Sequence, residues 1–169
     1  MMRNVTAFLL IDDGEIPNNP ALPVLVYEGV FKDKPEDIEA AFNRNGWTNS
    51  WVNGVFDYHH FHTNTHEVLG VRAGEAVVLI GGELGKRLEL KTGDVLVLPA
   101  GTGHKRLHQS PDFSVVGAYP DGRSPNLKKR LSTDVSQEIS EIKEVPLPEQ
   151  DPVFGTDGPL VEQWKTAVG

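Results

Sequence analysis

Residues 54–74 read GVFDYHHFHTNTHEVLGVRAG, and this short segment holds four of the six histidines of the chain. Alternate residues of a strand point to the same side, so the side chains of His60 and His62 are predicted to converge on one point. The four residues that follow, 63–66, are enough for a turn that brings Glu67 back beside them on the next strand. Two histidines and one carboxylate form a ligand set that binds a divalent metal and leaves coordination positions open.

The other two histidines lie in a second segment, residues 93–108, which reads GDVLVLPAGTGHKRLH. Together the two segments resemble the paired signature of the cupin superfamily. The fixed positions of the first signature are filled by Gly54, His60, His62, Glu67 and Gly74, and those of the second by Gly93, Pro99, Gly101 and His104. One position departs, because the second signature ends on asparagine where this chain has His108. Gly74 and Gly93 fall where tight turns require a positive φ.

The resemblance implies an all-β fold, the double-stranded β-helix or jelly roll. It also implies one divalent metal in the mouth of the barrel, held by His60, His62, Glu67 and His104. Fe, Mn, Ni and Zn all accept such ligands, and the sequence does not choose among them. Flanking segments resemble the YjlB-like group of bacterial cupins; they read YHHFH at 58–62, HEVLG at 66–70 and DPVFG at 151–155.

Hydrophobic patterning along the rest of the chain predicts a series of short strands, at 5–11, 24–27, 54–62, 67–73, 75–80, 86–90, 94–98, 104–108 and 113–119. Pro35 and Gly46 delimit one short N-terminal helix. Residues 126–143 are weakly helical, and the proline-rich residues 145–160 are predicted to be irregular. We expect one domain over residues 1–169, with a barrel core at about 47–120, an N-terminal arm at 1–46 and a C-terminal extension at 121–169.

The charge balance argues against nucleic acid as a partner. With 24 acidic and 16 basic residues, the formal net charge of −8 repels phosphate backbones. The chain has no cysteine, so any metal must rest on nitrogen and oxygen ligands. The apolar run at residues 7–11 is too short for a signal peptide core or a membrane span. We therefore expect a cytoplasmic protein without membrane contact, and its long N-terminal strands and apolar tail predict a homodimer.

Four further residues are candidates for the chemistry around the metal. His108 would share the inward face of an unbroken strand, either as a base or in place of the missing asparagine. Arg106 would capture a carboxylate or phosphate of a substrate, or lie at the barrel edge. Tyr58 is either a proton donor or a core residue. His66 is expected at the rim as a substrate contact, although a shift of one residue would let it replace Glu67 as a ligand.

The predicted function is that of a metal-dependent enzyme of the dioxygenase or isomerase type, acting on a small-molecule substrate. A dioxygenase needs a redox-active metal, whereas an isomerase works with redox-inert Zn as well. Two alternatives stay open. One is a non-enzymatic module that binds a small metabolite or a metal. The other is a metal-free barrel with satisfied interior histidines, including an epimerase in which a histidine and a carboxylate act alone, but all four ligand positions are retained.

Overall fold

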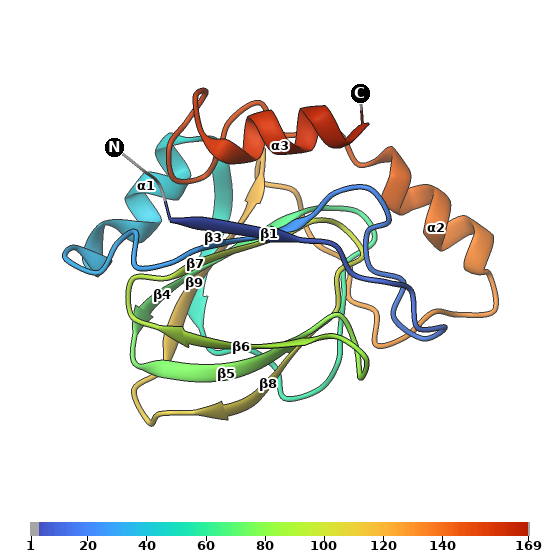
Figure 1. Cartoon of the computed structure of the whole chain (residues 1–169), viewed down its shortest axis with the longest axis horizontal. Helices are drawn as coiled ribbons and strands as arrows, with labels where there is room; N and C mark the ends of the chain where they lie inside the picture. Colours follow the sequence, from blue (N-terminus) through green and yellow to red (C-terminus); the bar gives the residue numbers. More distant parts are fainter. Residues whose placement is uncertain (1–3, 169) are drawn as a thin grey trace.

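Two antiparallel β-sheets form the body of the molecule in the computed structural model, which describes residues 4–168 (Figure 1). The larger sheet has the order β1-β2-β7-β4-β9-β3, and the smaller sheet has the order β6-β5-β8. The larger sheet comprises β1 (Val5–Phe8), β2 (Val24–Tyr27), β3 (Trp47–Asn53), β4 (Glu67–Ala73), β7 (Val95–Leu98) and β9 (Ser114–Pro120). The smaller sheet comprises β5 (Glu75–Ile80), β6 (Lys86–Lys91) and β8 (His104–Gln109).

From β4 onward the chain passes back and forth between the two sheets. β4 lies in the larger sheet, β5 and β6 in the smaller, β7 in the larger, β8 in the smaller and β9 in the larger. Neighbouring strands pair in antiparallel fashion throughout both sheets. This winding is that of a double-stranded β-helix, so the predicted all-β jelly-roll fold is confirmed.

The larger sheet is buried on both faces, which explains the unbroken apolar run of β7. Leu96 and Leu98 pack with the core between the sheets, whereas Val95 and Val97 belong to a second core on the outer face. There the sheet is covered by α1 (Ile38–Arg44) and α3 (Pro159–Val168), as Figure 1 shows. Because strands alternate their side chains, a strand covered on both faces needs an apolar residue at every position.

Most of the predicted strands agree with the structure. β2, β4 and β5 have the predicted bounds, and the strands predicted at 86–90, 94–98, 104–108 and 113–119 differ from β6, β7, β8 and β9 by one residue at one or both ends. β1 is shorter than predicted, because it ends at Phe8.

The strand predicted at 54–62 is wrong. The strand of this region is β3, which ends at Asn53, and residues 54–66 leave the sheet as a loop. β3 was hidden from the sequence pattern because a bulge between Thr48 and Trp51 interrupts the period of two, with Asn49 at a φ of 55°. The histidines of the first segment therefore lie on a loop rather than on a strand.

The helices agree with the predictions in part. The 3-10 turn η1 (Pro35–Asp37) leads into α1, which confirms the predicted N-terminal helix, and α2 (Val135–Glu144) overlaps the weakly helical stretch. α3 begins inside the segment predicted to be irregular, because a proline such as Pro159 fits the first turn of a helix, where its missing N–H has no helical partner. Among residues 4–168, no helix combines the length and apolar composition needed to cross a bilayer.

The C-terminal extension is tied to the larger sheet by one buried carboxylate. Asp151 is 0 % exposed, and its Oδ2 accepts a hydrogen bond of 2.6 Å from the hydroxyl of Tyr27 and one of 3.0 Å from the backbone N–H of Leu160. Its Oδ1 accepts from the backbone N–H groups of Val153 and Phe154. A single side chain thus joins β2, the turn after residue 151 and the start of α3.

The turn at Gly93 is a point where the fold requires glycine. Its φ is +97°, and that of Gly74 is +74°, which confirms the positive φ expected at both positions. A Cβ at position 93 would lie 2.4 Å from the backbone nitrogen of Lys32. We expect Gly93→Ala to lower the free energy of unfolding by about 3 kcal/mol, because left-handed strain is added to a backbone clash. Urea denaturation measures this loss.

Gly14→Ala is the matched control for this prediction. Gly14 has a similar φ of +91°, but no heavy atom lies within 4 Å of an added Cβ. Its replacement adds the left-handed strain alone, so the expected loss is about 1 kcal/mol. Equal losses in the two variants would contradict the importance of the contact with Lys32.

Candidate metal centre

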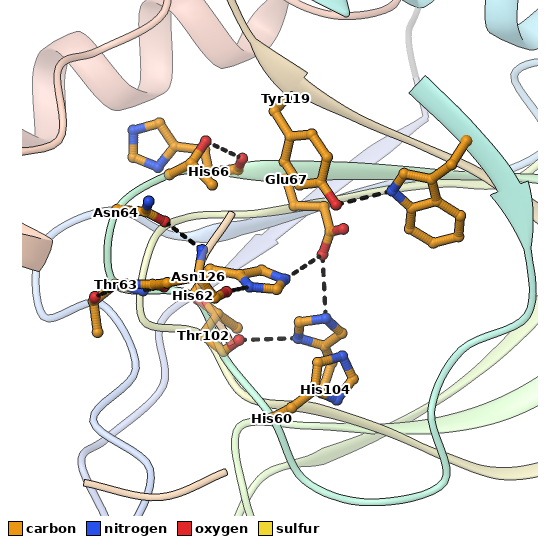
Figure 2. Close-up of polar contacts among 12 residues, drawn as sticks. His60, His62, Thr63, Asn64, His66, Glu67, Thr102, His104, Tyr119 and Asn126 are labelled. Carbon is orange, nitrogen blue, oxygen red and sulfur yellow. Dashed lines mark hydrogen bonds and ion pairs between the residues drawn. The ribbon is translucent and has the colours of Figure 1, made fainter. Parts of the chain in front are cut away.

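The four predicted ligands come together between the two sheets (Figure 2). His60 and His62 lie on the loop of residues 54–66, Glu67 is the first residue of β4, and His104 is the first residue of β8. All four side chains are buried, with exposed fractions between 2 % and 8 %. The loop is held to β8 by a bridge in which His60 and His104 exchange backbone hydrogen bonds of 3.2 and 3.0 Å.

The ring nitrogens and the carboxylate converge on one small volume. One nitrogen from each of His60, His62 and His104 lies within 4.8 Å of the other two. The Oε1 atom of Glu67 lies 3.4 Å from Nε2 of His62 and 3.2 Å from Nε2 of His104. These separations are of the size expected between atoms that share one cation.

Backbone carbonyls set the orientation of each imidazole. Nδ1 of His60 donates to the carbonyl of Tyr58 at 3.0 Å, and Nδ1 of His104 donates to that of Thr102 at 3.1 Å. Nδ1 of His62 donates to the carbonyl of Asn126. A carbonyl only accepts, so each Nδ1 carries a hydrogen, and in the neutral ring Nε2 is the nitrogen left to bind a cation. Histidine ligands of metals are oriented by partners of this kind.

The carbonyl that orients His62 is itself fixed by its neighbours. The side chain of Asn126 accepts from the backbone N–H of Thr63 at 2.9 Å and donates to the Thr63 hydroxyl at 2.7 Å. The backbone N–H of Asn126 donates to the side chain of Asn64 at 3.0 Å. The segment after β9 therefore fixes the loop that carries two of the candidate ligands, His60 and His62.

The electrostatics of the cluster keep the Glu67 carboxylate ionised and shift the pKa values of His60 and His62 in opposite directions. Burial, together with the nearby His104, lowers the pKa of His60 to about 3. Burial also acts to lower the pKa of His62, but the adjacent carboxylate of Glu67 outweighs burial and raises that pKa. Burial would raise the pKa of Glu67, yet the adjacent imidazoles of His104 and His62 outweigh it and hold this pKa well below its usual range.

The donor set fits a divalent cation. Glu67 Oε1 is buried and has no well-aligned hydrogen-bond donor, although two imidazole nitrogens lie close to it. A buried ionised oxygen without a partner is costly, and so are lone pairs that face one another. A cation bound to Nε2 of the three histidines and to this oxygen would remove both costs. His60, His62, Glu67 and His104 are therefore the residues that could hold a metal.

A cavity of about 660 Å³ opens from this cluster to the surface. Its walls are partly apolar, with Trp51, Val55 and Leu69 deep inside and the exposed side chains of Phe56 and Leu127 near the mouth. Arg106, for which the sequence left a substrate contact and a barrel-edge position open, also lines this cavity. The space is large enough for a small organic molecule beside the cluster.

Comparison with known proteins places the chain in a family. It is 44 % identical to the uncharacterized protein YjlB of Bacillus subtilis (strain 168) over 164 residues, which cover 97 % of this chain and 99 % of the relative. The chain belongs to the YjlB family. No family model matches the sequence. The double-stranded β-helix of this family member agrees with the fold that the cupin resemblance implied.

Solved structures give more distant similarities. Acireductone dioxygenase from Bacillus anthracis, with a cadmium ion in its active center, is 23 % identical over 57 % of this chain and 64 % of its own, with a TM-score of 0.36. A Klebsiella pneumoniae protein with a double-stranded β-helix domain is 16 % identical over 70 % and 82 %, with a TM-score of 0.39. A TDP-fucose-3,4-ketoisomerase from Campylobacter jejuni is 14 % identical over 81 % and 94 %, with a TM-score of 0.42. Similarities at this level assign no reaction to the YjlB family.

His108 does not lie in the cavity of this YjlB family member, so its predicted inward orientation is wrong. Val77 pairs with His108 and the next residue, Val78, pairs with Arg106, so Leu107 forms a bulge. A bulge adds one residue and reverses the alternation of side chains beyond it. His108 is exposed and lines a separate surface pocket with Glu89, on the outside of the smaller sheet.

His66 is not at the rim, nor does it replace Glu67. It is 0 % exposed and packs its ring against Trp164 of α3, at 4.8 Å between centroids. Its Nδ1 accepts from the backbone N–H of Ala100, and its Nε2 donates to the carbonyl of Pro146. Burial lowers the pKa of His66 to about 3, so it stays neutral. As the neighbour of Glu67, it faces the C-terminal extension rather than the cavity.

Tyr58 also lies outside the cavity lining. Its ring stacks on Phe56 and lies under the ammonium of Lys129, and it borders a different surface pocket with His59 and Glu83. The tyrosine that lines the cavity is Tyr119, near the end of β9, which sequence reasoning missed. The strand itself was predicted, but its position next to β4 was not.

Proposed function

We propose that this protein is a metal-dependent enzyme that acts on a small organic anion in the cavity, by oxygenation or isomerisation. One observation supports the proposal above all. One nitrogen from each of three imidazoles and the unpartnered Oε1 of Glu67 converge at the bottom of a cavity that is open to small molecules. A cation bound by all four would offset the cost of burying the ionised carboxylate, which favours a metal site over a metal-free epimerase.

His60, His62, Glu67 and His104 would hold the cation. A divalent Fe, Mn, Ni or Zn ion there would act as a Lewis acid toward a substrate oxygen, and a redox-active one would also support chemistry with dioxygen. The chain itself shields the four ligand side chains, which are buried and can be reached from solvent through the partly apolar cavity. Nothing in the donor set distinguishes the two reaction types.

Arg106 is the residue we propose to bind the anionic group of the substrate. Its Nε donates to the carbonyl of Val55 at 3.1 Å, which fixes the plane of the guanidinium. Its Nη2 approaches the exposed carboxylate of Asp57 only to 3.9 Å, and such exposed pairs contribute little. A guanidinium held in this way suits two-point binding of a carboxylate or phosphate. Phe56 and Leu127 at the mouth would contact the apolar part of the molecule.

The proposal is tested by metal content and by ligand binding. We expect about one equivalent of a divalent metal in protein purified without chelator, by elemental analysis. Small oxo- and hydroxycarboxylates and phosphates, compared with their neutral amides and alcohols, should quench the fluorescence of Trp51 in the cavity wall. Arg106→Ala should weaken anion binding by about 100-fold, as lost bidentate contacts do, and leave the metal content unchanged.

Oxygen uptake by Fe-loaded protein with the bound anions separates the two reaction types. Consumption of dioxygen identifies an oxygenase, whereas a change in the substrate without oxygen uptake identifies an isomerase. A metal-free wild-type protein would refute the proposal outright. Metal without any anion turnover would leave a metal-binding protein and refute the enzymatic part.

A further inference from the structure

Three neighbouring strands of the larger sheet place a second polar group beside the metal cluster. β3, β9 and β4 lie side by side, and they contribute Trp51, Tyr119 and Glu67 to the cavity wall. In the pairing of β4 with β9, Val68 faces Ala118, so the next pair in this register is Glu67 and Tyr119. Directly opposite side chains on one face of a sheet are within contact distance. Figure 2 shows the phenol hydroxyl beside the carboxylate of Glu67.

Gly117 has no side chain, and this leaves room for the indole of Trp51 beside Tyr119. Trp51 pairs with Gly117 across β3 and β9, and a Cβ at position 117 would lie 2.2 Å from the indole ring. The indole therefore occupies the space over Gly117 and extends toward Tyr119. Its Nε1–H donates a hydrogen bond of 2.8 Å to the phenol oxygen (Figure 2).

The chemistry of these groups sets the direction of the hydrogen bonds. An indole N–H can only donate, so the phenol oxygen of Tyr119 accepts from Trp51 and its own hydrogen is directed elsewhere. The ionised carboxylate of Glu67 can only accept, and it lies next to that hydroxyl.

We propose that Tyr119, oriented by Trp51, is a positioning residue that holds the Glu67 carboxylate with Oε1 directed at the metal. Oε1 is the carboxylate atom that lacks a hydrogen-bond donor and faces the imidazoles, so the support must act on the rest of the group. The tyrosine hydroxyl would orient the carboxylate, as the backbone carbonyls orient the histidine rings. This inference rests on the proposed metal site and extends it to a residue outside the ligand set.

The test compares two buried tyrosines in the full-length protein. Tyr119→Phe removes the hydroxyl and keeps the ring, and we expect the affinity for Co²⁺ to fall by about 10-fold or more, the usual effect of losing a partner of a ligand. The visible absorption spectrum of bound Co²⁺ should also change, because the carboxylate is no longer held in one orientation. Trp51→Phe should produce a smaller change of the same kind.

Tyr27→Phe is the matched control. Tyr27 is likewise buried and also bonds a carboxylate, that of Asp151, but on the outer face of the sheet. This variant should lose stability in urea while it binds Co²⁺ with the wild-type affinity and spectrum. A wild-type affinity and spectrum in Tyr119→Phe, or equal losses in the two tyrosine variants, would overturn the inference. Failure of the wild type to bind Co²⁺ would instead refute the metal site itself, and the inference with it.

Discussion

Replacing His60 and His62 together with alanine is expected to abolish stoichiometric metal binding. The variant loses two of the four donors, and even a residue that only orients a ligand contributes about 10- to 100-fold to affinity. We therefore expect the dissociation constant for Co²⁺ or Zn²⁺ to rise by about 10⁴-fold or more, measured by competition titration. The thermal shift supports the same conclusion, because metal at 100 times the dissociation constant stabilises the wild type by about 2.7 kcal/mol and should not stabilise the variant.

A second double variant separates metal binding from a general loss of histidines. His59→Ala with His108→Ala also removes two imidazoles, one from the same loop of residues 54–66 and one from β8. His59 pairs with the exposed Glu83 at 2.6 Å, and His108 faces a different pocket, so neither reaches the cluster. This control should keep its metal and its thermal shift. Retention of metal by the His60 and His62 variant would contradict the ligand assignment.

Asp151→Ala is expected to cause the largest loss of stability among single substitutions at the C-terminal extension. The buried carboxylate accepts hydrogen bonds from the Tyr27 hydroxyl and from the N–H groups of Val153, Phe154 and Leu160. Buried donors that lose an acceptor cost 1–3 kcal/mol each, with partial relaxation in the turn, so we expect a loss of about 4 kcal/mol in the free energy of unfolding. Urea denaturation followed by far-UV circular dichroism measures this loss.

The metal site and an exposed aspartate provide the controls. Asp151 lies on the outer face of the larger sheet, so folded Asp151→Ala protein should still bind Co²⁺ as the wild type does. Asp33→Ala removes an exposed carboxylate, and its effect should stay within about 0.5 kcal/mol. A loss below 1 kcal/mol in Asp151→Ala would contradict the role of this carboxylate as the tie between β2 and α3.

The successes and failures of the sequence-based predictions have a common physical origin. Alternation of apolar residues depends on neighbours two positions apart, so β2, β4 and β5 were predicted with their bounds. The same rule failed at two bulges that shifted the phase of a strand. The bulge in β3 hid that strand, and the bulge at Leu107 in β8 turned His108 outward while Arg106 stayed in the cavity.

For the residues around the cluster, too, the sequence predicts the local structure but not the contacts between distant segments. Tyr119 lies on a strand that the sequence predicts. Its proposed role depends on facing Glu67 across β4 and β9, and four other strands lie between these two along the chain. His66 precedes Glu67 directly, and only the packing of α3 against the sheet shows that it is enclosed beside Trp164. No local pattern carries information about such partners.

The sequence by itself determined most of the short strands, because strand periodicity is a local property of the chain, and its resemblance to the cupin signatures implied the jelly-roll fold and the four side chains that meet in it. Tertiary structure alone decided which other polar residues share the cavity with those donors. That choice depends on strand register, on two bulges and on the path of the C-terminal extension. These features are set by pairing between residues far apart in the chain, where a shift of one position moves a side chain to the opposite face.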